Sequence, residues 1–316
     1  MEIIKKGKSL ATFNRKRKIF YIALIALPVL QFCIFYLGVH INSILLAFKS
    51  YTLTDGQSGL YSYVFTGFEN FEQVFHNFAT ESYLVNAIWN SVLAFLVGWI
   101  GFCGSLLFSY YIMKKWRFGK LFQLFLFLPS IISEIVVVSL FKYFTENNIP
   151  AFIEMIGGEA VSGFVYSSDL NVRLISLLVY SVWIGFGANI LIFNGTMSGV
   201  SESVLEAAKL DGVRPLREFF SIVLPMMYPT IVTLAVVNVA NIFTNQMYLF
   251  SFYGASAERK LYTIGYYLYL NTQEAGNSGL SEYPYLAAFG LVVSAVTIPL
   301  TIGFRKVMNK IGERFE

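Results

Sequence analysis

The sequence predicts an all-α integral membrane protein with six transmembrane helices. Hydrophobic residues make up 56% of the 316-residue chain and charged residues only 13%, against roughly 25% charged residues in soluble domains. The hydrophobic residues gather in runs that reach the length of about 20 residues needed to cross a bilayer. The basic residues gather between alternate runs, as expected when a chain passes back and forth through a membrane.

Six segments are long and apolar enough to be transmembrane helices. The first is too long for the apolar region of a secretory signal and lacks a small-residue cleavage site, so we interpret it as a retained span. Pro28 and Pro299 lie inside spans, where neighbouring helices can satisfy the backbone groups that proline leaves free. The predicted spans are Ile19–Phe48, Tyr83–Met113, Leu121–Phe144, Leu174–Val200, Met226–Phe252 and Tyr285–Phe304.

The positions of lysine and arginine predict that both termini lie in the cytoplasm. Cytoplasmic loops of membrane proteins are enriched in these residues. With the N-terminus inside, 18 of the 23 basic residues fall on the cytoplasmic side. The exceptions are Lys49, Lys142, Arg173, Arg259 and Lys260. The basic clusters near the two termini are best interpreted as anchors to anionic membrane lipid.

This topology divides the chain into four parts. Residues 1–18 form a basic cytoplasmic segment, and residues 19–82 form the first transmembrane helix and an extracellular loop. Residues 83–304 form a core of five transmembrane helices, and residues 305–316 form a basic cytoplasmic tail. A short charged stretch, residues 201–225, interrupts the core between spans four and five and lies in the cytoplasm.

The charged stretch predicts two short helices. The sequence SVLE at 203–206 matches a capping box, in which the serine and the glutamate satisfy backbone amides at a helix start. A helix is therefore expected over Val204–Asp211, with Gly212 in the left-handed conformation that ends many helices. Pro215 suits the first position of a second helix. We call these two short helices the elbow. The elbow reverses the chain, but two separately capped helices exceed what a reversal needs, which favours a docking role.

The stretch EAAKLDGVRPLREFFSIVLP, residues 206–225, resembles the EAA loop of bacterial ABC importer permeases. Val213 stands where alanine is usual, and Ser201 stands near a position where sugar permeases commonly have proline. The matching positions are Glu206, Ala207, Ala208, Asp211, Gly212, Phe219, Ile222, Leu224 and Pro225.

Other segments resemble the larger-type subunit of carbohydrate permease pairs, such as the maltose, glycerol-phosphate and multiple-sugar systems. They are residues 16–48, the sequence LFLFLPSIIS at 124–133 and the sequence VWIGFGANILIFNGTMSGV at 182–200. The likeness weakens at 253–255, where many relatives have a GGP turn and this chain has YGA. The extracellular loop 253–283 is therefore expected to be particular to this protein.

The resemblance implies a type I ABC importer permease fold in a bacterial cytoplasmic (inner) membrane. It implies a second homologous permease subunit, two copies of an ATP-binding subunit and an extracellular solute-binding protein that delivers a carbohydrate. The charged stretch would be the coupling helix that docks on an ATP-binding subunit. The ATPase-coupling residues implied are Glu206, Ala207, Ala208, Asp211 and Gly212, of which the two alanines also give the helix a slim surface for close approach.

The sequence predicts no enzyme and no cofactor in this chain. The nearest approach to a phosphate-binding loop, Gly7-Lys8-Ser9, would need its first glycine where Glu2 stands, and no strand precedes it. ATP and magnesium are therefore expected on the partner subunits. The two histidines and two cysteines are not spaced as metal ligands, and no metal site or nucleic-acid partner is predicted.

Polar residues inside the spans are candidates for a substrate pathway. Asn238, Asn241 and Asn245 are spaced by three and four residues, so a helix would place them on one face, continued by Tyr248. Such a stripe faces either other helices, as interhelical hydrogen bonds, or water. In the family that the sequence resembles, the fifth span contributes to the pathway, which favours lining. Glu134 is the one acid well inside a span, a place where acids are often functional.

Four other asparagines inside spans are interpreted as packing residues; they are Asn86, Asn90, Asn189 and Asn194. Glu134 follows Pro129, so a break in the helix beside it is expected to bring it water or a partner group.

The function predicted is that of the membrane subunit of an ATP-driven importer for a mono- or oligosaccharide, working by alternating access. One alternative is the same machinery for a non-sugar or sugar-phosphate solute, although the spans offer almost no basic residues to a phosphate. A secondary transporter would show internal repeats and an ion site, and no repeat is visible. A receptor or scaffold would not need the elbow.

Overall fold

The computed structural model describes residues 2–53, 61–159, 161–278 and 282–313. The chain forms two compact units. Unit 1 comprises residues 1–74 and 279–291, and unit 2 comprises residues 75–278 and 292–316.

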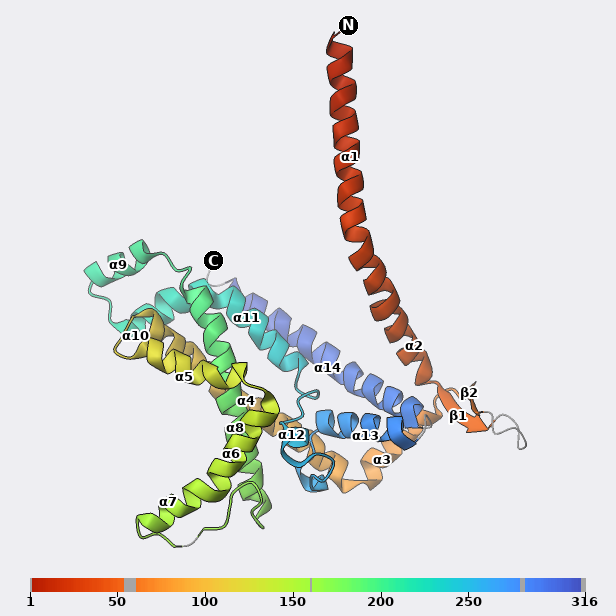
Figure 1. The fold of residues 1–316 in the computed structure, drawn as a ribbon, viewed down its shortest axis with the longest axis vertical. Helices are drawn as coiled ribbons and strands as arrows, with labels where there is room; N and C mark the ends of the chain where they lie inside the picture. The colour runs from red at the N-terminus through yellow and green to blue at the C-terminus, as the bar shows by residue number, and fades with distance from the viewer. Residues whose placement is uncertain (1, 54–60, 160, 279–281, 314–316) are drawn as a thin grey trace. The chain divides into compact units, whose positions relative to one another are not determined.

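Unit 1 begins with one long helical run (Figure 1). The run is apolar and long enough to cross a membrane from Arg17 to Leu46, close to the predicted first span, and Pro28 lies inside it without ending it. The basic segment predicted at 1–18 is helical from Glu2 and continuous with the span. The run consists of α1 (Glu2–Gln31), the π-helical segment η1 (Phe32–Gly38) and α2 (Val39–Leu46).

A β-hairpin follows the first span in unit 1, and the prediction of an all-α chain missed it. The strands pair antiparallel, with Lys49 opposite Phe65. Asn70 fixes the hairpin to the end of α2, because its side-chain amide donates hydrogen bonds to the carbonyl oxygens of Ala47 and Lys49, at 2.9 and 2.7 Å. The elements are β1 (Lys49–Leu53), β2 (Tyr61–Phe65) and, beginning in this unit, α3 (Glu69–Thr80).

Unit 2 is built on long apolar helices, and it contains the predicted spans two to five with most of span six. The two helices with the most extensive contact, α4 and α8, lie side by side in Figure 1. Small residues allow this approach: a Cβ added to Gly104 would lie 2.8 Å from the ring of Phe186, and Ser109 donates a hydrogen bond across to the Ile190 carbonyl at 3.2 Å. The helices are α4 (Ser82–Met113), α8 (Leu170–Met197), α11 (Leu224–Ala240) and α14 (Tyr283–Gly312), the last belonging to unit 2 from residue 292.

The core of unit 2 lies between α4, α8 and α11. It is a cluster of buried apolar side chains, and its largest members are aromatic rings that meet edge to face, as Phe102 and Phe193 do with centroids 5.2 Å apart. The cluster consists of Phe102, Leu106, Tyr110, Phe193, Met197, Phe219, Val223, Met227, Ile231 and Ala235.

The predicted third span, Leu121–Phe144, is not one straight helix. The chain bends by 111° between α5 and α6, so the two together make a broken span. Pro129 weakens the end of α5, and Ile132 and Ser133 adopt extended backbone angles at the break. The predicted break beside Glu134 is confirmed. The segments are α5 (Gly119–Ile131), α6 (Glu134–Tyr143), η2 (Phe144–Asn148) and α7 (Ile149–Met155).

The predicted fifth span, Met226–Phe252, is also wrong at its end, because α11 stops at Ala240. Asparagine side chains compete with the helix there: the Asn245 side-chain oxygen accepts a hydrogen bond from the backbone amide of Met247 at 2.8 Å. Met247 and Tyr248 then have positive φ angles of 52° and 57°, which no helix accommodates. A short helix, α12 (Leu249–Tyr253), follows.

The predicted extracellular loop 253–283 is ordered in the part of it that the structure describes. It contains the 3-10 turn η4 (Arg259–Leu261) and α13 (Ile264–Ser278). Asn90 of α4 holds this segment, because its amide donates hydrogen bonds to the carbonyl oxygens of Lys260 and Tyr262, at 2.8 and 3.0 Å. Its interpretation as a packing residue is confirmed.

Over the described residues, five helices are long and apolar enough to cross a membrane by length and composition, and the bent pair makes a sixth. The six predicted spans are therefore present. Between spans four and five stand the elements of the elbow: α9 (Glu202–Leu210), α10 (Pro215–Glu218) and the π-helical segment η3 (Phe219–Val223).

Candidate functional site

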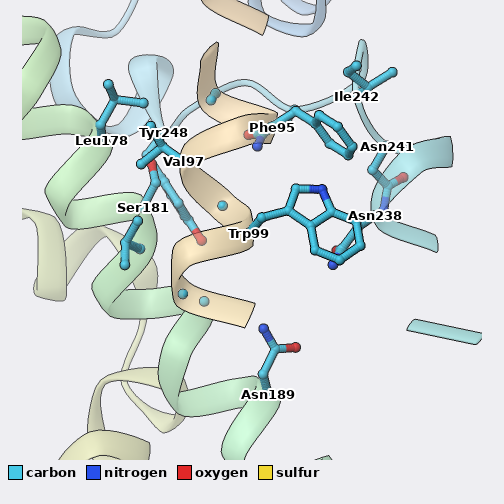
Figure 2. Close-up of a pocket in the computed structure, with 16 residues that line it drawn as sticks. Phe95, Val97, Trp99, Leu178, Ser181, Asn189, Asn238, Asn241, Ile242 and Tyr248 are labelled. Atoms are coloured by element: carbon cyan, nitrogen blue, oxygen red, sulfur yellow. The ribbon is translucent and has the colours of Figure 1, made fainter. Parts of the chain in front are cut away.

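A polar cavity lies among the helices of unit 2. Its volume is about 210 Å³, and its walls come from α4, α8, the end of α11 and the loop after α11. Figure 2 shows the indole of Trp99 projecting from α4 toward Asn238 and Asn241. No lining residue is charged. The polar and aromatic residues of the lining are Phe95, Trp99, Ser181, Asn189, Asn238, Asn241, Asn245 and Tyr248.

The structure brings the whole predicted stripe to this cavity, although not on one helix. Asn238 lies in the last turn of α11, and Asn241 is the residue that ends it. Asn245 and Tyr248 reach the cavity from the loop that follows. Thr263 donates a hydrogen bond to the Asn245 carbonyl at 2.8 Å, so the segment before α13 helps to hold this loop.

Several cavity residues escaped the sequence analysis. Phe95 and Trp99 are four residues apart and so share a face of α4, but this spacing is uninformative in a chain in which 17% of the residues are aromatic. Asn189 was interpreted as a packing residue, whereas the structure places it in the cavity lining.

Glu134 is not among the residues that line the cavity. It is the first residue of α6, where its negative charge is favourable beside the free amides of a helix N-terminus. Its carboxylate also accepts a hydrogen bond from the hydroxyl of Ser251 on α12. Glu134 thus joins the break in the third span to the end of the fifth, and its part in a substrate pathway stays a prediction.

Cysteines placed in the cavity lining are expected to react with water-soluble maleimides. In a background with Cys33 and Cys103 replaced by serine, Asn238→Cys, Asn241→Cys and Asn245→Cys should each be labelled in at least one state of the transport cycle. The physical reason is that a cavity lined by polar amide side chains holds water. Labelling is measured by mass shift of the purified complex.

The control for this labelling is Ser109→Cys, because Ser109 is fully buried between α4 and α8. It should stay unlabelled in every state. If the three asparagine positions also stay unlabelled while the complex turns over, the asparagines only hold helices together.

The second candidate region is the elbow, whose first helix, α9, stands away from the transmembrane helices of unit 2 in Figure 1. The expected end of its first helix is confirmed, because Gly212 has φ +69°. The Gly212 amide donates a hydrogen bond to the Lys209 carbonyl at 3.1 Å, and the Val213 amide donates one to the Ala208 carbonyl at 3.0 Å. These two bonds are the Schellman pattern of a left-handed helix end.

The start of the elbow differs from the prediction. The helix α9 begins at Glu202, two residues earlier than the capping box requires, and Ser201 precedes it without a side-chain capping bond. The hydroxyls of Ser201 and Ser203 bond each other instead, at 2.7 Å. The second predicted helix starts at Pro215 as expected, but it runs on through η3 into α11 as one helical run.

The coupling residues implied by the resemblance lie mostly on the free surface. Glu206, Ala207, Asp211 and Gly212 are exposed. Ala208 is only 5% exposed, so of the two alanines Ala207 alone offers the slim surface that was expected. Two apolar side chains of the elbow are also exposed, Leu210 by 88% and Leu216 by 70%. Exposed apolar side chains beside charged ones are typical of a surface that binds another protein.

This arrangement, six apolar spans with an ordered helical elbow between the fourth and fifth, defines a transporter permease. Residues 101–311 match the family described as binding-protein-dependent transport system inner membrane component, and the chain belongs to this family. It is a multi-pass inner-membrane permease subunit of an ABC importer, as the EAA-like sequence indicated.

Curated relatives and solved structures agree with this family. The sn-glycerol-3-phosphate transport system permease protein UgpA of Pectobacterium atrosepticum is 27% identical over 251 residues, which are 78% of this chain and 82% of that protein. UgpA of Yersinia pestis is 26% identical over 249 residues, 78% of this chain and 81% of that protein.

The fold resembles a chain of a crystallised bacterial ABC transporter involved in the import of the acidic polysaccharide alginate. The TM-score is 0.74 at 20% identity, and the superposition covers 94% of this chain and 98% of that one. A second structure, of a bacterial alginate ABC transporter with an alginate pentasaccharide-bound periplasmic protein, gives a TM-score of 0.75 at 19% identity, covering 95% and 98%. The likeness is one of fold, and it confirms the type I permease architecture.

Proposed function

We propose that this chain translocates a neutral carbohydrate, a mono- or oligosaccharide, delivered by an extracellular solute-binding protein. The observation that carries the proposal is the cavity lined by asparagine amides and aromatic rings without a charge. Each amide both donates and accepts hydrogen bonds, as sugar hydroxyls do. The rings of Phe95 and Trp99 offer apolar faces to the apolar face of a sugar ring.

The second candidate is a sugar-phosphate or glycerol-phosphate solute, and the UgpA relatives favour it. A buried phosphate would need lysine or arginine to pair with, because an unpaired charge is costly away from water. The cavity lining contains neither residue. We therefore place the neutral sugar first.

In this proposal the other functions of the importer complex belong to other subunits. A second permease completes the pathway, and two copies of an ATP-binding subunit bind ATP and magnesium and hydrolyse the nucleotide. The support for this division is the elbow, which exposes the apolar side chains of Ala207, Leu210 and Leu216, as a surface that binds a protein partner does. The absence of a phosphate-binding loop in the sequence also supports it.

The test is uptake by the purified complex in proteoliposomes. With the matching solute-binding protein and ATP, labelled neutral sugars should accumulate, and glycerol-3-phosphate should not. The control is this chain purified alone, which should hydrolyse no ATP. Uptake of glycerol-3-phosphate without uptake of any neutral sugar would overturn the choice of substrate, and hydrolysis by the chain alone would overturn the division of labour.

A further inference from the structure

A buried carboxylate ties the elbow to the end of α4. Glu218, the last residue of α10, is only 2% exposed. Its two oxygens lie 2.9 and 3.1 Å from the ammonium group of Lys114. The hydroxyl of Tyr110 lies 3.1 Å from one of the same oxygens and 2.9 Å from the Pro215 carbonyl. Glu218, Lys114 and Tyr110 form what we call the Glu218 cluster.

The local structure explains why the charges are tolerated here. Lys114 ends α4, so its positive charge faces the carbonyl end of that helix. Glu218 lies in the first turn of the long helical run that begins with α10, so its negative charge is close to the amide end of that run. The next residue, Lys115, has φ +54°, so the chain leaves the helical direction there, and the Lys114 side chain reaches Glu218 of the elbow.

The Glu218 cluster connects two walls of the polar cavity. The helix α4 carries Phe95 and Trp99, and the run that starts at α10 continues through η3 and α11 to Asn238. On its other side the elbow carries the exposed residues Glu206 and Ala207. The cluster is therefore a buried polar contact through which a displacement of the elbow can reach α4 as well as α11.

We propose that the Glu218 cluster is a positioning contact that makes the elbow and α4 move together when the ATP-binding subunits close. The proposal rests on the proposed function of the elbow as a docking element. Beside the cluster, the ring of Phe219 packs against the ring of Tyr110, with centroids 5.0 Å apart, and belongs to the apolar core. An ion pair with one buried partner adds little net stability to such a core, but it can fix which groups face each other.

The test uses variants that break and rebuild the ion pair in the reconstituted complex. Glu218→Gln and Lys114→Met each remove one charge. The double variant Glu218→Lys with Lys114→Glu exchanges the charges and keeps a pair in the same place. The matched control exchanges the neighbouring Lys115 and Glu202, whose charged atoms lie 4.0 Å apart with side chains 84% and 86% exposed. Exposed pairs of this kind contribute little.

Two quantities are measured: sugar imported per ATP hydrolysed, and hydrogen exchange of the backbone amides in residues 202–223. For each single variant we expect the ratio to fall about tenfold and the exchange to rise about tenfold. The ATP-binding subunits should still co-purify. The charge exchange at 114 and 218 should restore both quantities, and the exchange at 115 and 202 should change neither.

The outcomes separate this proposal from the proposed function. If the single variants match the parent in both quantities, or if the charge exchange rescues neither, the Glu218 cluster is not a positioning contact. If exchange rises while the ratio is unchanged, the cluster only stabilises the fold locally, which also overturns the proposal. If the parent complex imports no sugar, the proposed substrate is wrong, and the ATP turnover stimulated by the binding protein replaces the ratio as the test of the cluster.

Discussion

Replacement of Gly187 by alanine is expected to destabilise the helical core of unit 2 more than any other single-methyl change in α8. A Cβ at this position would lie closer than 3.0 Å to the carbonyl oxygen of Leu126 on α5. This neighbouring atom belongs to the backbone, so no side chain can rotate away, and α5 must move. Overpacking of this kind costs about 1–3 kcal/mol, and a backbone clash places the change at the upper end.

The matched control is Gly195→Ala in the same helix, because a Cβ there meets nothing within 4 Å. Both variants gain the same helix propensity, so their difference isolates the contact with α5. The measurement is the midpoint of thermal unfolding of the protein in detergent, followed by the loss of the monodisperse peak on size exclusion. A midpoint for Gly187→Ala equal to that of Gly195→Ala would mean that α5 and α8 do not pack as described.

The spans were predictable because apolar length belongs to a single segment and needs no partner. The interruptions of the spans were harder to predict from the sequence. Pro129 and Glu134 together indicated the break in the third span, since a proline and an acid are both unusual inside one. The end of α11 at Ala240 depends on local bonds made by Asn241 and Asn245, and the 3.6-residue spacing of those asparagines suggested the opposite.

The residues of the cavity could also be predicted only in part. The sequence placed Asn238, Asn241 and Asn245 together through a helical stripe, and the structure brings them together through a helix end and a loop. Trp99 could not be chosen from the sequence, because nothing in α4 distinguishes an aromatic ring that faces a cavity from one that faces lipid. That distinction depends on how α4 packs against α8 and α11.

The elbow was also predictable only in part: the end of its first helix was predicted correctly and the start was not. Glycine at a helix end has a single strong cause, the left-handed backbone, and Gly212 was predicted correctly. A helix start has several competing solutions, and here two serines bond each other in place of the expected capping box. The buried state of Glu218 required knowledge of Lys114 and Tyr110, more than a hundred residues away in sequence.

Replacement of Gly212 by valine is expected to abolish productive docking of the ATP-binding subunits while leaving the spans folded. Gly212 has φ +69°, and a Cβ there would meet nothing within 4 Å. Any effect must therefore come from backbone conformation and not from a clash. A left-handed residue with a side chain costs roughly 1–2 kcal/mol, and a β-branched one is worse still. The chain would relieve this strain by unwinding the turn that orients Glu206 and Ala207.

A graded series distinguishes this cause from a general loss of fold. Gly212→Asn should behave nearly as the parent, because asparagine visits the left-handed region readily. Gly212→Ala should be intermediate and Gly212→Val most affected. Co-purification of the ATP-binding subunit and binding-protein-stimulated ATP turnover are measured, with the thermal midpoint of the chain alone as a check that the spans are intact. If asparagine and valine give the same result as glycine in both assays, the elbow serves only to reverse the chain, because its conformation then has no bearing on the partner it was expected to dock.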